Sequence, residues 1–128
     1  MNRTTTLLCA SIMGGLAVVI GAFGAHAFKP FLTETGRTDT FELAVRYQFY
    51  HTLAMLGAGT LMTHFQSRLL SMSALFFALG IFLFSGSLYV LCFTGLTMLG
   101  AVTPFGGVFF IAGWLLLALG THKNGKAS

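Results

Sequence analysis

The most constraining feature of this sequence is the absence of Asp, Glu, Lys and Arg from three long intervals. These intervals are residues 4–28, 47–67 and 69–122. A membrane-spanning helix needs about 20 predominantly apolar residues, so each of the first two intervals matches one such helix. Only 8% of all residues are charged, whereas the surface of a soluble domain is roughly a quarter or more charged. The chain is therefore predicted to be an integral membrane protein.

The third interval is too long for one helix and must contain a turn. As a single helix it would extend roughly 80 Å, far beyond a hydrocarbon core of about 30 Å. The stretch TGLTMLGAVTPFGG (94–107) gathers threonines, glycines and a proline, which predicts the turn. Continuous apolar runs favour helices over the alternating strands of a membrane barrel. The sequence thus predicts a single all-α domain, an integral membrane four-helix bundle with helices at about 4–28, 41–64, 69–93 and 102–121.

The few basic residues predict the orientation of these helices. With four spans, one side of the membrane carries Arg3, Arg68, Lys123 and Lys126, and the other carries Lys29 and Arg37 beside two acidic residues. The positive-inside rule therefore predicts that both termini lie in the cytoplasm. Seven basic residues scattered over helix ends form no patch for nucleic acid, despite the net charge of +4. We expect residues 122–128 to form a flexible tail.

The first apolar segment shares features with a secretory signal. It follows Arg3 and ends in Ala25-His26-Ala27, an A-x-A pattern typical of cleavage sites. Its apolar stretch, residues 7–23, is longer than the roughly 7–15 residues of a usual signal. We therefore expect this segment to be retained as the first membrane helix.

Polar side chains of the apolar intervals are predicted to lie at a shared depth. The first helix ends near His26, the second begins with the polar run 42–51, and the third carries its polar residues near its end. Because consecutive helices run antiparallel, these positions fall in the same half of the bundle in either orientation. The candidate site residues are His26, Glu42, Arg46, Tyr47, Gln48, Tyr50, His51, Ser85, Ser87 and Tyr89.

Several interpretations of this cluster remain open. In the structural one, Glu42 and Arg46 form an i, i+4 ion pair and His51 is a hydrogen-bonded core histidine. In the functional one, Arg46 offers positive charge to a lipid headgroup or small anionic ligand, and His51 senses or relays protons. A haem or zinc site using His26 and His51, with Glu42 for zinc, has less support, because no HxxxH or CxxC spacing accompanies these residues. We therefore predict neither a metal nor a cofactor. No GxSxG or Walker-type motif is present, which favours a non-enzymatic protein.

Four segments together resemble a known family. They are GAFGAHAFK (21–29), FELAVRYQFYH (41–51), FSGSLYVLCFTG (84–95) and TPFGGVFFIAGW (103–114). In this order they resemble the YgdD/YwdK-like family of small bacterial inner-membrane proteins, an uncharacterised protein family. The resemblance implies an unprocessed, multi-pass, four-helix protein of the bacterial inner membrane. It implies no activity and no catalytic residue.

Three functional hypotheses follow. The first is a non-enzymatic membrane protein whose polar pocket binds a lipid headgroup or small anionic ligand. The second is a structural or assembly role, in which small-residue faces of the first and fourth helices contact copies of the chain or another complex. The third is a small transporter or proton-relay protein, which is less well supported because the chain has no pair of interrupted helices.

Overall fold

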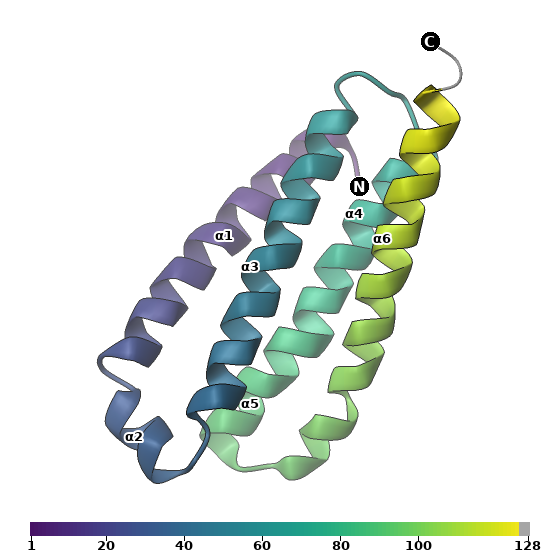
Figure 1. Cartoon of the computed structure of the whole chain (residues 1–128). Coiled ribbons are helices and arrows are strands. Elements are labelled where there is room, and N and C mark those ends of the chain that lie inside the picture. Colours follow the sequence, from purple (N-terminus) through teal and green to yellow (C-terminus); the bar gives the residue numbers. More distant parts are fainter. Residues whose placement is uncertain (126–128) are drawn as a thin grey trace.

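The structure is a computed structural model that describes residues 1–125. Four long helical rods run antiparallel to their neighbours in sequence. The start of the first rod and the end of the last rod therefore lie at the same end of the molecule (Figure 1). The helices are α1 (Arg3–Ala25), α2 (Lys29–Glu34), α3 (Thr38–Leu61), α4 (Arg68–Ile81), a π-helical segment (Phe82–Gly86), α5 (Ser87–Thr94), a 3-10 helix (Thr97–Ala101) and α6 (Thr103–Gly125). The predicted all-α four-helix fold is confirmed.

The element boundaries differ from the prediction in three places. The polar linker after the first rod contains a helical turn, α2, because Pro30 suits the start of a helix and Leu32 is almost fully buried. The third rod is one continuous helix whose middle, Phe82–Gly86, is π-helical. Helix α6 continues to Gly125, into the segment expected to be a flexible tail, whose last residues, 126–128, lie outside the described part of the chain.

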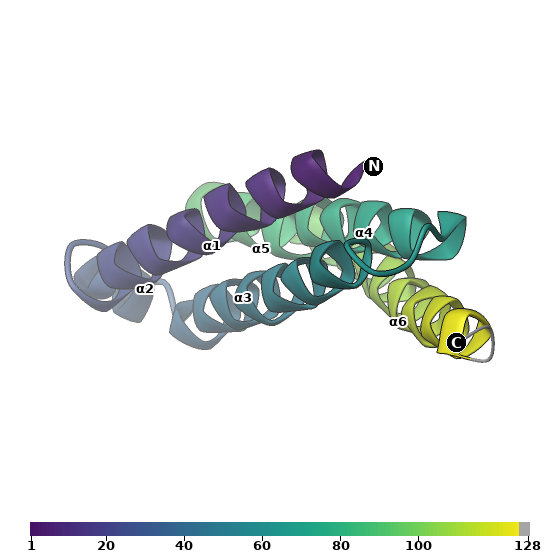
Figure 2. The same ribbon diagram turned by 90° about the horizontal axis from the view of Figure 1, so that it is seen from above.

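The rods are packed as a folded row. Helix α3 lies between α1 and α4, and α6 packs mainly against α4, so α1 and α6 occupy the two ends of the row (Figure 2). Nine of the 24 residues of α3 are buried, against three of 23 in α1. The interior of the fold is therefore built around α3 and α4.

Three of the four rods are long and apolar enough to cross a membrane: Arg3–Ala25, Arg68–Thr94 and Thr97–Lys123. The remaining rod, α3, is of similar length but carries Asp39, Glu42 and Arg46 near its start. These three charged residues are exposed, whereas Gln48, His51 and Thr52, further along α3, are buried between its neighbours. A buried polar side chain that faces another helix can find a hydrogen-bond partner that lipid does not offer.

Helix α6 and the π-helical segment of the third rod approach each other closely through their backbones. A Cβ atom added to Gly106 would lie 2.4 Å from the backbone nitrogen of Phe84 in the π-helical segment. Only a residue without a side chain fits there. The neighbouring Gly107 has no such neighbour within 4 Å. Gly106 therefore fixes where α6 crosses the third rod.

Candidate functional site

Gln48 and Tyr89 meet in the interior, as the sequence predicts. The Tyr89 hydroxyl donates to Gln48 Oε1 at 2.8 Å, and Gln48 Nε2 donates to the backbone carbonyl of Met13 at 2.9 Å. Gln48 is only 4% exposed. Each partner comes from a different rod, so this network joins α1, α3 and α5. A buried amide without such partners would cost several kilocalories per mole in an apolar environment.

The two serines of the candidate site make separate contacts. Ser85 is fully buried and donates to the backbone carbonyl of Ala44 at 2.7 Å, which ties the π-helical segment to α3. Ser87 shares a 2.9 Å hydrogen bond with the Thr103 hydroxyl at the start of α6. These hydroxyls connect neighbouring helices.

His51 lies in an aromatic part of the core that faces α4 and α6. Its Nδ1 lies 2.8 Å from the Tyr47 carbonyl, which can only accept, so Nδ1 carries the proton. The imidazole stacks on Phe110, with ring centroids 3.4 Å apart, and Tyr47 stacks on Phe84. The prediction that His51 is a hydrogen-bonded core histidine is confirmed. Its role in sensing or relaying protons stays a prediction.

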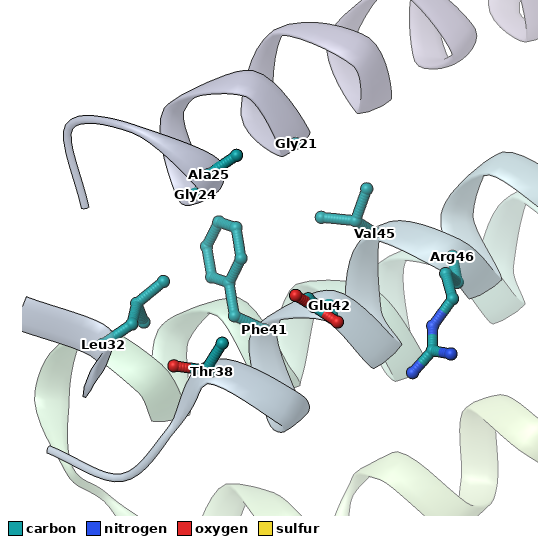
Figure 3. Close-up of a pocket in the computed structure, with 9 residues that line it drawn as sticks. All are labelled: Gly21, Gly24, Ala25, Leu32, Thr38, Phe41, Glu42, Val45 and Arg46. Atoms are coloured by element: carbon teal, nitrogen blue, oxygen red, sulfur yellow. The ribbon is translucent and has the colours of Figure 1, made fainter. Parts of the chain in front are cut away.

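Four of the candidate residues lie on the outer surface of the fold: His26, Glu42, Arg46 and Tyr50. The prediction of an ion pair between Glu42 and Arg46 is wrong, because no such pair forms within the described residues. The side chains of Glu42 and Arg46 extend in different directions from α3 (Figure 3).

The ten candidate residues therefore do not line one shared pocket. Hydrophobic packing divides them, because it turns Gln48 toward α1 and α5, His51 toward α6, and Arg46 outward. Among residues 1–125, no three His, Cys, Asp or Glu side chains lie together in a position to hold a metal ion. His26, Glu42 and His51 are thus not brought together. Whether any of the ten binds a ligand stays a prediction.

The structure instead shows a groove of about 220 Å³ on the side of the fold where α1, α2 and the first turns of α3 meet (Figure 3). Its lining is Gly21, Gly24, Ala25, Leu32, Thr38, Phe41, Glu42, Val45 and Arg46. Of these, only Glu42 and Arg46 were predicted as site residues. This groove, which we call the α1–α3 groove, is the candidate functional site.

The shape of the α1–α3 groove follows from two glycines of α1. A Cβ added to Gly24 would lie 2.3 Å from Cε1 of Phe41, and one added to Gly21 would lie 3.2 Å from the Val45 side chain. The backbone of α1 therefore forms one wall directly. Phe41 is held in place by ring contacts with Phe28, Tyr89 and Phe93. The glycine-rich run GAFGA (21–25) is the sequence signal for a close helix contact here. The sequence does not show that Phe41 and Val45 of α3 are the side chains that face it.

The charges of the α1–α3 groove lie at its edge. Arg46 and Glu42 are exposed, and both line the groove. The helical rise places Arg46 roughly 12 Å along α3 from Thr38. Within a membrane-spanning segment a guanidinium is costly unless it pairs or extends toward the headgroup layer. The guanidinium of Arg46 points away from α1, so the groove has a positive and a negative charge at the edge of its apolar surface (Figure 3).

Comparison with known proteins shows the family. A family model described as "Protein of unknown function (DUF423)" matches residues 20–107. The "UPF0382 inner membrane protein YgdD" of Escherichia coli strain K12 is 43% identical over 125 residues, which cover 96% of this chain and 93% of that protein. The "UPF0382 membrane protein SSP2132" of Staphylococcus saprophyticus is 39% identical, over 91% of this chain and 96% of the relative. No solved structure matches.

The names of these relatives state a location and no activity. Relatives named as inner membrane proteins agree with the three apolar helices able to span a bilayer, so the chain is an integral membrane protein. The resemblance noted from the four sequence segments is confirmed. The family model covers most of this chain, and the two relatives cover more than nine-tenths of it. The chain therefore belongs to the DUF423 family of uncharacterised membrane proteins.

Proposed function

We propose that this protein binds the phosphate of a membrane lipid headgroup at the α1–α3 groove, with Arg46 as the binding cation. One observation carries the proposal. Arg46 lines the groove, is exposed, and has no hydrogen-bond or ion-pair partner among the residues that the structure describes. A phosphate is a fitting partner, because the guanidinium presents donors in a planar fork that matches phosphate oxygens.

The walls of the groove suit the apolar part of the same ligand. Leu32, Phe41 and Val45 supply apolar side chains, and the α1 backbone packs directly against Phe41 and Val45 at Gly24 and Gly21. A free inorganic anion would use Arg46 alone. An amphiphile uses the charge and the apolar walls together, which favours a lipid over a small soluble anion.

The groove supports a binding role rather than catalysis. Its lining contains no histidine, serine or cysteine. The interior polar groups Gln48, Tyr89 and Ser85 are engaged in hydrogen bonds that join helices. The groove does hold the hydroxyl of Thr38 and the carboxylate of Glu42, but no hydrogen bond joins them in the described residues, so they are not paired as nucleophile and base for acyl or phosphoryl transfer. The assembly and transport alternatives stay predictions.

Native mass spectrometry of the detergent-purified full chain, titrated with diacyl phospholipids, tests the proposal. We expect Arg46→Gln to weaken phospholipid binding roughly tenfold or more, as the loss of a charge-assisted hydrogen bond would. Gly24→Ala should weaken it too, because the new methyl group displaces Phe41 into the groove.

Matched variants away from the groove serve as controls. Arg68→Gln removes an exposed arginine at the start of α4, and Gly15→Ala adds a methyl group to α1 where no other atom lies within 4 Å. Neither should change lipid binding. Equal binding by Arg46→Gln and Arg68→Gln would overturn the proposal.

A further inference from the structure

The α1–α3 groove holds an acidic side chain as well as a basic one, and neither has an ion-pair or hydrogen-bond partner among residues 1–125. Glu42 precedes Arg46 by four residues on α3, the arrangement that best favours an ion pair within a helix. The pair nonetheless does not form in the described residues, and both side chains line the groove. Their side chains extend in different directions from α3 (Figure 3). Because both are exposed and free to rotate, their opposite charges, roughly 6 Å apart along the helix axis, can turn toward one ligand.

The two charges have a fixed order along α3. Glu42 lies nearer the end of the rod and Arg46 lies one turn deeper. Phe49 and Leu53, which continue the same stripe at i+7 and i+11 from Glu42, are 39% and 50% exposed. From the end of the rod inward, the outer surface of α3 thus presents an anion, a cation and then apolar side chains.

This order matches one class of membrane lipid. Building on the proposed function, we propose that the α1–α3 groove selects phospholipids with a phosphoethanolamine headgroup. Arg46 binds the phosphate, Glu42 binds the primary ammonium, and an acyl chain lies against the apolar walls and the deeper part of the stripe. The two-carbon link between phosphate and ammonium allows both contacts at once.

The carboxylate of Glu42 is the selective element. It repels a headgroup that carries only negative charge, such as that of phosphatidylglycerol, because like charges at short range are unfavourable. A choline headgroup has the positive charge but no N–H, so it cannot donate a hydrogen bond to the carboxylate. Selectivity thus arises from a repulsive and a directional contact together.

The test compares three lipids of identical acyl chains on the detergent-purified full chain: phosphatidylethanolamine, phosphatidylglycerol and phosphatidylcholine. Binding is measured by native mass spectrometry for the wild type, Glu42→Gln and the control Glu34→Gln. Glu34 is an exposed acid of α2 that does not line the groove. We expect the wild type and the control to bind phosphatidylethanolamine most strongly. Glu42→Gln should lower the ratio of ethanolamine to glycerol lipid binding roughly tenfold.

The outcomes separate this inference from the proposed function. Binding that depends on Arg46 but ranks the three lipids alike, or is unchanged by Glu42→Gln, would overturn the headgroup assignment and leave phosphate binding intact. Loss of all dependence on Arg46 would overturn both. Glu42 is exposed, and the thermal melt of Glu42→Gln in detergent verifies that a changed ratio comes from a folded protein.

Discussion

The contact between Gly106 and the π-helical segment gives the sharpest test of the fold. In Gly106→Ala, the new Cβ would lie 2.4 Å from the Phe84 nitrogen, 2.7 Å from its Cβ and 2.8 Å from its Cα. Two of these three atoms belong to the backbone, so no side-chain rotation relieves the clash. Helix α6 must move away from the third rod.

The magnitude follows from the cost of overpacking and the gain in helix propensity. Forcing an extra methyl group into a packed interior costs about 1–3 kcal/mol, while replacing glycine by alanine in a helix contributes up to about 1 kcal/mol. In Gly107→Ala the second effect acts alone, because no other atom lies within 4 Å of the added Cβ. We therefore expect Gly106→Ala to be less stable than Gly107→Ala by roughly 2 kcal/mol.

Unfolding of the purified protein by sodium dodecyl sulfate in mixed micelles measures this difference. Trp114 is the sole tryptophan of the chain and lies beside Phe77, with ring centroids 5.2 Å apart, so its fluorescence reports on the α4–α6 contact. The two glycines are neighbours in the same helix, so the gain in helix propensity is the same for both variants and only the contact with Phe84 differs. Equal unfolding free energies for the two variants would refute the crossing described above.

Two further substitutions test the buried polar groups by the same titration. Thr52 is 1% exposed and its hydroxyl is the buried side-chain atom without a hydrogen-bond partner among the described residues, so Thr52→Val should raise the unfolding free energy by about 1 kcal/mol; a decrease would show that the hydroxyl has a partner. Tyr89→Phe leaves Gln48 Oε1 without its donor and should lower the unfolding free energy by about 1–3 kcal/mol; no change would mean that the network does not stabilise the fold.

The number of rods could be predicted from sequence because charge is confined to their ends. The charge-free intervals determine which residues can lie in lipid, and chain length divides them into spans. The same reasoning placed Gln48 and Tyr89 at one depth, and the structure joins them directly. The position of a residue along its rod is thus the property that could be predicted most directly from this sequence.

Direction around each helix could not be predicted in the same way. Apolar residues surround α1 and α6 on all sides, so no polar face marks which side meets a neighbour. Helix α3 carries polar groups on several sides, and their spacing in sequence does not show which side meets which neighbour. Gln48 faces α1 and His51 faces α6, whereas Arg46 is exposed. The π-helical segment adds a further rotation within the third rod.

The polarity of α3 has a consequence for biogenesis. A charged residue opposes release of a helix into lipid, by about 2.5–3.5 kcal/mol at the helix centre and by less toward its ends. Helix α3 carries three charges in its first turns and is the least apolar of the rods. Its polar side chains have ready partners on a helix made earlier, as Gln48 shows with Met13. We therefore expect α1 and α3 to leave the insertion machinery together, as a helical hairpin. In that hairpin the Met13 carbonyl of α1 accepts the hydrogen bond from Gln48, and the glycines of α1 allow α3 to pack closely.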